Sequence, residues 1–178
     1  MNWNPFKKKQ EEPAVDPTRI TLSDLKPGYV LDYDLKTWQV TAHHYYDYDG
    51  DRVDEWELAS GDDVAYLEGA EDDGMRWILS HKIQLSDMDN NIRNHMRNND
   101  NPPDRVVCKG VTYRGESSVV GRYYKNGQGV GEEFLVWDYL DDTEKHTLSI
   151  EQWGDDEYEA SVGDVVEEYQ FSNILPGQ

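Results

Sequence analysis

The residues that most resemble a chemical site are three aspartates at alternate positions, Asp47, Asp49 and Asp51. Oxygen ligands at this spacing are typical of the start of an EF-hand calcium loop. The pattern then fails, because glycine is the fourth residue of the segment instead of the sixth. Leu58 occupies the twelfth position, where a bidentate glutamate is needed. We therefore expect a solvated turn here and no metal site.

Paired carboxylates are the second kind of chemistry that the chain could support. A glycoside hydrolase needs two converging acids, but with 37 Asp and Glu residues close pairs arise without catalysis. Asp54-Glu55 and Glu132-Glu133 are sequence neighbours, and neighbours on a strand point to opposite faces. The sequence also lacks a phosphate-binding glycine loop and a nucleophile elbow. We predict neither catalytic residues nor a cofactor.

The histidines and the single cysteine do not form a metal-binding pattern. His43 and His44 are adjacent, so on a strand they face opposite sides and cannot bind one ion. We expect His44 to be a hydrogen-bonded core residue. Cys108 ends the apolar run Val106–Cys108, which predicts a buried thiol. One cysteine allows no internal disulfide and no cysteine-based zinc site.

Aromatic side chains beside carboxylates are the best candidates for binding. The chain has 6 Trp and 12 Tyr residues, and such side chains often anchor protein partners. They also stack on sugars. We assign Trp56 and Phe134 to the core and expect other aromatic residues to lie partly exposed. The candidate partner-binding residues are Tyr45, Glu55, Tyr123, Glu133 and Trp153.

The second half of the chain resembles the first. Tyr45-Tyr46 is followed by Asp54-Glu55-Trp56, and Tyr123-Tyr124 is followed by Glu132-Glu133-Phe134, with an offset of 78 residues (from 45 to 123 and from 55 to 133). Such similarity predicts an internal duplication. The alternative is two similar hairpins in one continuous sheet.

The elements that must position these residues are mostly strands. Apolar and polar residues alternate from Trp38 to Tyr46, with the period of a half-buried strand. A three-residue loop, Asp49–Asp51, would pair Trp56 with His44 and place the apolar residues of both strands on one face. It would leave Glu55 opposite Tyr45 on the outer face.

The remaining pattern predicts further strands and one helix. The helix should run from Asp87 to Asn98, with Met88, Ile92 and Met96 on one face. Further strands are expected at 64–67, 75–85, 106–108, 111–113, 119–124, 132–140, 147–153, 158–162 and 165–171, and a loop at 173–178. The fold class is mainly β, with two similar antiparallel β-meander or barrel-like halves joined by one short helix. The boundaries are 1–19 for a flexible basic leader and linker, 20–98 for the first half with its terminal helix, and 99–178 for the second half.

The net charge of −20 is shared by both halves. An acidic surface repels phosphate backbones, so we expect no nucleic-acid partner. The simple interpretation is a solvated, salt-adapted surface. The alternatives are a protein partner with a basic face and mimicry of nucleic acid. No apolar run is long enough for a membrane span or a signal peptide, and we expect a cytoplasmic protein.

The first 19 residues differ in character from the rest. Trp3 and Phe6 precede three consecutive lysines, Lys7, Lys8 and Lys9. Such a segment suits weak contact with an anionic membrane surface, at about 1 kcal/mol per lysine. The alternative is a solvated terminus with no partner.

Several motifs in order resemble one bacterial family, the domain of unknown function DUF 4178. They are Leu25–Gly28, Trp38–Val40, Asp54–Leu58, Gly110–Tyr113, Trp137–Tyr139, Leu148–Glu151 and Tyr158–Ala160. The resemblance covers roughly residues 22–176. It implies no established activity, cofactor or catalytic residue. Members are often encoded beside envelope-stress and small membrane proteins, which implies an accessory role near the membrane by association.

Three hypotheses for function follow. The first is a soluble, cytoplasmic β-rich interaction module with a basic or membrane-associated protein partner, accessory to an envelope or membrane-stress system. The second is a binding module for carbohydrate or another small molecule, with Tyr45, Tyr123 and Trp153 around a concave site. The third is an enzyme with two carboxylates, which requires an acid pair in a pocket with a raised pKa.

Overall fold

The computed structural model describes residues 20–72, 74–89 and 91–177. The strands are β1 (Val30–Tyr33), β2 (Lys36–Tyr48), β3 (Asp51–Ser60), β4 (Asp63–Asp72), β5 (Gly74–Ile83), β6 (Arg105–Cys108), β7 (Val111–Tyr124), β8 (Glu132–Asp141), β9 (His146–Gly154), β10 (Glu157–Val166) and β11 (Ser172–Leu175). Within these described residues the α-helix is α1 (Ile92–Asn99), and four short 3-10 helices cover Leu22–Asp24, Leu85–Asp87, Lys125–Gly127 and Glu168–Gln170. The mainly β class is thereby confirmed for the described part of the chain.

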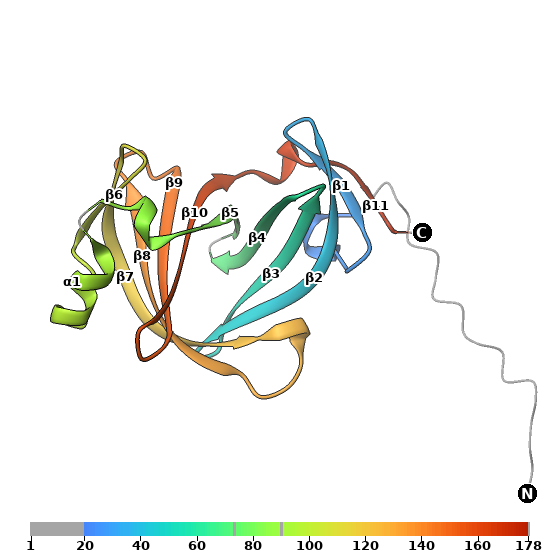
Figure 1. Ribbon diagram of the computed structural model, residues 1–178. Helices are drawn as coiled ribbons and strands as arrows, with labels where there is room; N and C mark the ends of the chain where they lie inside the picture. Colours follow the sequence, from blue (N-terminus) through green and yellow to red (C-terminus); the bar gives the residue numbers. More distant parts are fainter. Residues whose placement is uncertain (1–19, 73, 90, 178) are drawn as a thin grey trace, which may run out of the picture.

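The strands form one antiparallel sheet that closes on itself. Its order is β11-β1-β2-β3-β4-β5-β10-β9-β8-β7-β6, and β2 also pairs with β7. The circuit from β2 through β5, β10 and β7 back to β2 is therefore a closed ring of strands. Figure 1 shows β1–β4 and β11 on one side, which we call the first lobe, and α1 with β6–β9 on the other, which we call the second lobe. Strands from both halves of the sequence share one sheet, so the duplication is not confirmed.

Each lobe has its own core on the outer face of the ring. In the first lobe Trp56 is 3% exposed and donates its indole N–H to the Leu25 carbonyl at 3.0 Å. In the second lobe Ile92 and Met96 of α1 pack with Cys108, and all three are buried. The helix begins at Ile92 instead of Asp87, so Met88 is not on its face: Met88 has extended backbone and forms an isolated β-bridge with Cys108. All three predicted residues, Met88, Ile92 and Met96, are nevertheless buried.

The predicted register of the β2–β3 hairpin is wrong. Asp49 and Gly50 both have positive φ (59° and 107°), the geometry of a two-residue hairpin loop, for which Asp-Gly is well suited. Tyr48 therefore pairs with Asp51, and His44 lies opposite Glu55. A register shift at Thr41 then places Val40 opposite Leu58. This bulge turns the first part of β2 toward the first-lobe core and leaves His44 and Tyr46 on the inside of the ring.

The C-terminal segment also differs from the prediction. The expected strand at 165–171 ends at Val166, and Glu168–Gln170 is a 3-10 helix. The expected terminal loop instead contains β11, which pairs with β1. This pairing joins the end of the described chain to its beginning, a long-range contact without a local sequence signal.

Candidate functional site

The inside of the ring is unusually polar for an interior. Alternation along β2 points His44, Tyr46 and Tyr48 inward, where they meet Glu55 of β3 and Trp153 of β9. A small apolar group of Tyr46, Phe134 and Val136 lies at its centre. The ring interior thus contains buried carboxylates beside aromatic rings.

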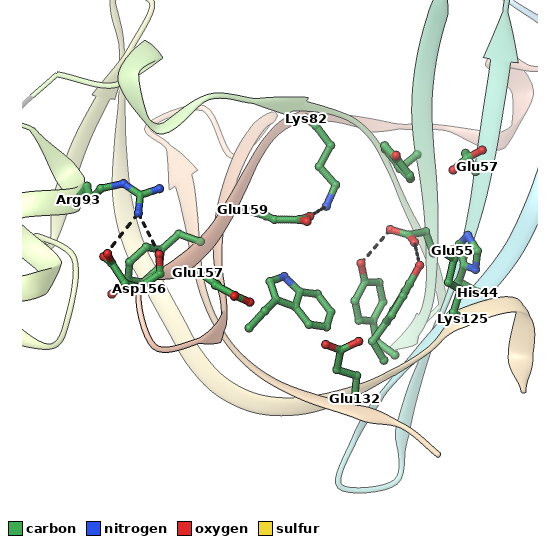
Figure 2. Close-up of a pocket in the computed structure, with 15 residues that line it drawn as sticks. His44, Glu55, Glu57, Lys82, Arg93, Lys125, Glu132, Asp156, Glu157 and Glu159 are labelled. Carbon is green, nitrogen blue, oxygen red and sulfur yellow. Dashed lines mark hydrogen bonds and ion pairs between the residues drawn. The ribbon is translucent and has the colours of Figure 1, made fainter. Parts of the chain in front are cut away.

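One mouth of the ring forms a pocket of about 680 Å³, which we call the central pocket. Figure 2 shows carboxylates on several sides of this hollow. Its acidic lining residues are Glu55, Glu57, Glu132, Asp156, Glu157 and Glu159, and its basic ones are Lys82, Arg93 and Lys125. Arg93 is paired with Asp156, and Lys82 with Glu159. The pocket therefore carries an excess of negative charge when its acids are ionised.

Glu55 is the most enclosed acid of the central pocket. It is 3% exposed, and its two oxygens accept hydrogen bonds from the hydroxyls of Tyr46 (2.9 Å) and Tyr123 (3.4 Å). Burial raises the pKa of Glu55 to about 7, although the two hydroxyls and Lys82 act in the opposite direction. Near neutral pH this side chain is therefore a mixture of acid and carboxylate.

Aromatic rings form one wall of the central pocket. The rings of Tyr123 and Trp153 meet edge to face with centroids 5.6 Å apart, and Trp153 stacks on Phe134 at 4.7 Å. The indole N–H of Trp153 donates to Glu151 at 3.1 Å, which fixes the orientation of the ring. The wall is thus held rigidly by packing and by a hydrogen bond.

His44 presents a hydrogen-bond donor at the same pocket. The side chain is 3% exposed, and its Nδ1 accepts the backbone N–H of Asn126 at 2.9 Å. Burial lowers the pKa of His44, so the ring is neutral near pH 7 and its proton sits on Nε2. Nε2 has no hydrogen-bond partner among the described residues, and His44 lines the pocket. The expectation of a hydrogen-bonded, buried histidine is confirmed.

Further acids lie deeper in the ring. Burial raises the pKa values of Glu68, Glu151 and Asp138. For Glu68 and Glu151 the charges of neighbouring carboxylates act in the same direction, whereas hydrogen bonds from two serine hydroxyls oppose the shift at Asp138. Glu68 and Asp138 line a second pocket of about 320 Å³, with hydroxyl groups from serine and threonine residues around them. The Nζ of Lys82 lies 3.8 Å from Glu151. The interior therefore contains more carboxylates than nearby cations, and burial favours the protonated form of these acids.

The structure brings three of the five predicted site residues together. Glu55, Tyr123 and Trp153 line the central pocket. Tyr45 lies elsewhere and stacks on Tyr124 at 4.4 Å, and Glu133 is exposed near Arg122 at 4.0 Å. The expectation that Glu55 faces outward is wrong, because the two-residue loop places it opposite His44 on the inner face. Tyr123 also faces inward, where β7 pairs with β2 opposite Tyr46.

Other pocket residues were not among the predicted set. Tyr46 and Glu132 line the central pocket, although Tyr45 and Glu133 were preferred from the sequence. The sequence signal is the strict alternation of β-strands, by which a neighbour of each chosen residue faces the other side. Once one residue of each strand is assigned to the correct face, this alternation places both Tyr46 and Glu132 on the pocket side.

The described residues show neither a metal-ligand set nor a membrane-spanning helix. Across residues 20–72, 74–89 and 91–177, no three His, Cys, Asp or Glu side chains are grouped as ligands for an ion. In the same part of the chain no helix is both long and apolar enough to cross a bilayer.

The fold and the pocket define a β-rich domain with an acidic, aromatic-walled hollow between two lobes. The chain belongs to the family described as "Domain of unknown function (DUF4178)", which matches residues 26–168. The resemblance expected from the sequence is thereby confirmed. The chain is also 26% identical over 171 residues to an uncharacterized protein from Aquifex aeolicus (strain VF5), covering 96% of this chain and 94% of that relative. No solved structure matches.

Proposed function

We propose that the protein is a cytoplasmic interaction module that binds a basic segment of a partner protein in the central pocket. The observation that carries this proposal is the position of the Tyr123–Trp153 wall directly beside Glu55, with further carboxylates around the rim. A concave site with a few placed polar groups is the usual form of a binding site.

The charge of the pocket favours a cationic occupant. Of its basic side chains, Arg93 and Lys82 already pair with carboxylates, whereas Glu57, Glu132 and Glu157 have no salt bridge among the described residues. The net charge of −20 adds a long-range field of the same sign. Such a field accelerates the association of a basic partner and disfavours acidic ones.

The aromatic lining supports the same occupant. A cation above an aromatic face gains roughly 0.5–2 kcal/mol, depending on its desolvation. The pocket already uses this contact internally, since Lys82 lies 5.5 Å from the Tyr66 ring and Arg93 lies 5.6 Å from the Tyr158 ring. Tyr123 and Trp153 offer further ring surface to a ligand in the same hollow.

An accessory role near the envelope is part of the proposal. The N-terminal residues Trp3, Phe6 and Lys7–Lys9 lie outside the described residues, and their weak contact with a membrane surface stays a prediction. A module tethered in this way would meet basic, membrane-proximal segments of envelope proteins.

Calorimetric titration with a model peptide tests the proposal. The probe is an end-capped peptide with alternating lysine and glycine, and an aspartate–glycine peptide is the matched negative control. We expect the basic peptide alone to bind. Glu132→Gln should weaken binding about threefold to tenfold, corresponding to a lost interaction of about 1 kcal/mol.

The adjacent residue provides the matched control variant. Glu133→Gln makes the same chemical change one residue away, on an exposed side chain outside the central pocket. Its binding should equal that of the wild type. Equal losses in the two variants would show that only net charge matters and would refute a role for the pocket.

A carbohydrate or small-molecule ligand is the second candidate. Trp153 and Tyr123 line a concave site together with carboxylates, as this hypothesis requires, but Tyr45 lies outside it. Titration with a set of neutral oligosaccharides separates the candidates. Binding of a sugar that requires Trp153, without binding of the basic peptide, would favour the second candidate.

An enzyme with a carboxylate pair is supported by a single feature, the raised pKa of Glu55 in a pocket. A general acid in glycoside hydrolysis has this property. Turnover of chromogenic glycosides that is lost in Glu55→Gln would establish such an activity.

A further inference from the structure

The position of Glu55 allows a more specific statement about the occupant, which rests on the proposed function. We propose that the group bound at the bottom of the central pocket is a primary ammonium, the lysine side chain of the partner, and that it displaces the proton which Glu55 holds in the empty pocket. In this step the Glu55 carboxylic acid releases its proton to solvent and the resulting carboxylate pairs with the ammonium.

The oxygen atoms around Glu55 suit an ammonium. The phenol oxygens of Tyr46 and Tyr123 lie 2.9 and 3.4 Å from the two carboxylate oxygens. An ammonium has three N–H donors and no acceptor. Its donors match a carboxylate oxygen and the adjacent phenol oxygens, which retain free lone pairs while they donate to Glu55.

The same hydrogen bonds disfavour a guanidinium. Arginine recognises a carboxylate best through two parallel N–H bonds to both of its oxygens. Each oxygen of Glu55 already accepts one tyrosine hydroxyl, and the side chain is 3% exposed. A guanidinium therefore does not find both carboxylate oxygens free for two parallel hydrogen bonds. An ammonium is compact, is carried on a flexible stem and needs only one oxygen.

The residues around Glu55 also provide apolar ring surface for the lysine stem and a second hydrogen-bonding group. The rings of Tyr46 and Tyr123 pack with centroids 5.0 Å apart, and Trp153 closes the wall next to Tyr123. Methylene groups of a lysine stem pack well on such surfaces. At the rim, the Nε2–H of His44 faces the pocket without a partner among the described residues and is suited to donate to a main-chain carbonyl of the bound segment.

The groups that face Glu55 explain why an added cation would favour its ionised form. They are Tyr46 and Tyr48 of β2, Tyr66 and Glu68 of β4, Lys82 of β5, Glu151 of β9 and Tyr123 of β7. Lys82 is the one cation in this set, and it is already paired with Glu159 and close to Glu151. A second cation brought by the ligand would favour the ionised form of Glu55, consistent with its pKa of about 7 in the empty pocket.

The test is calorimetric titration of the full chain with three capped peptides that differ in one type of side chain. They alternate glycine with lysine, with arginine or with Nε-acetyl-lysine. Each titration is run at pH 6 and at pH 8, in two buffers of different ionisation enthalpy at each pH, so that the number of released protons is measured. We expect the lysine peptide to bind at least about tenfold more tightly than the arginine peptide. Nearly one proton should be released per site at pH 6 and about a tenth of a proton at pH 8.

Two variants identify the source of the proton. Glu55→Gln should abolish the proton release and weaken lysine binding, whereas Glu132→Gln should weaken binding and keep the release. Circular dichroism confirms that both variants are folded. Equal binding of lysine and arginine peptides, or proton release that persists in Glu55→Gln, would overturn the inference and leave the proposed function intact. Binding of neither peptide would overturn the proposed function itself.

Discussion

Replacement of Glu55 by glutamine should stabilise the protein in a pH-dependent way. In the folded state the pKa of Glu55 is raised from 4.5 to about 7, because the side chain is buried. The folded state therefore holds the proton more tightly than the unfolded chain. The stability linked to this proton is fully present below about pH 4.5 and is lost as the pH rises through about 7.

The size of the effect follows from the same shift. A change from 4.5 to about 7 corresponds to roughly 3 kcal/mol between the two protonation states. Glutamine has the shape of the protonated acid and cannot ionise. Glu55→Gln should thus equal the wild type within about 1 kcal/mol at pH 5 and exceed it by about 2–3 kcal/mol at pH 8.

Urea unfolding followed by tryptophan fluorescence measures this difference. Glu133→Gln is the control, since its exposed side chain should give no pH-dependent change. Glu55→Gln should itself lose some stability between pH 5 and pH 8, because the pKa values of Glu68, Glu151 and Asp138 are also raised. This loss should be smaller than that of the wild type. A variant that is destabilised equally at both pH values would refute the assignment of Glu55 as a buried acid that holds a proton.

Three further predictions concern packing and the limits of the site. Gly121→Ala should destabilise by about 1–3 kcal/mol in thermal or urea unfolding, because the new Cβ would lie 2.7 Å from the Tyr48 ring, whereas Gly115→Ala, with no contact closer than 3.7 Å, should be tolerated. A wild-type melting curve for Gly121→Ala would contradict the packed interior of the ring. Met96→Ala should cost about 2–5 kcal/mol by urea unfolding, because this side chain is 1% exposed under α1; a cost below 1 kcal/mol would mean that α1 is not part of the core. Tyr45→Ala should leave the affinity for the basic peptide unchanged in calorimetry, since Tyr45 stacks outside the central pocket; a large loss would place the binding surface there instead.

Local patterns predicted much of the second lobe. The Lys109-Gly110 turn has positive φ at both residues (49° and 82°), as a tight hairpin requires. Ile92 and Met96 form the buried face of α1 as expected, and Met88 is buried outside the helix. These features depend on neighbours in sequence, where propensity and periodicity are informative.

The site was only partly predictable, because it depends on long-range pairing. The unbroken alternation from Trp38 to Tyr46 gives no sign of the bulge at Thr41. This bulge turns the first part of β2 toward the first-lobe core and the rest toward the interior of the ring. A strand without the bulge and with Trp56 buried places Glu55 on the solvent face. In the structure both faces of β3 are covered, so a buried tryptophan and a buried glutamate occupy adjacent positions.

The most direct test of the central claim is nuclear magnetic resonance of the indole N–H groups. Trp153 lines the central pocket, whereas Trp38, Trp56 and Trp77 are buried in the first-lobe core. The Trp153 signal, assigned with Trp153→Phe, should shift in proportion to added lysine–glycine peptide, and the three core signals should stay in place. An unmoved Trp153 signal at saturating peptide, or equal shifts of the core signals, would contradict binding in the pocket between the lobes.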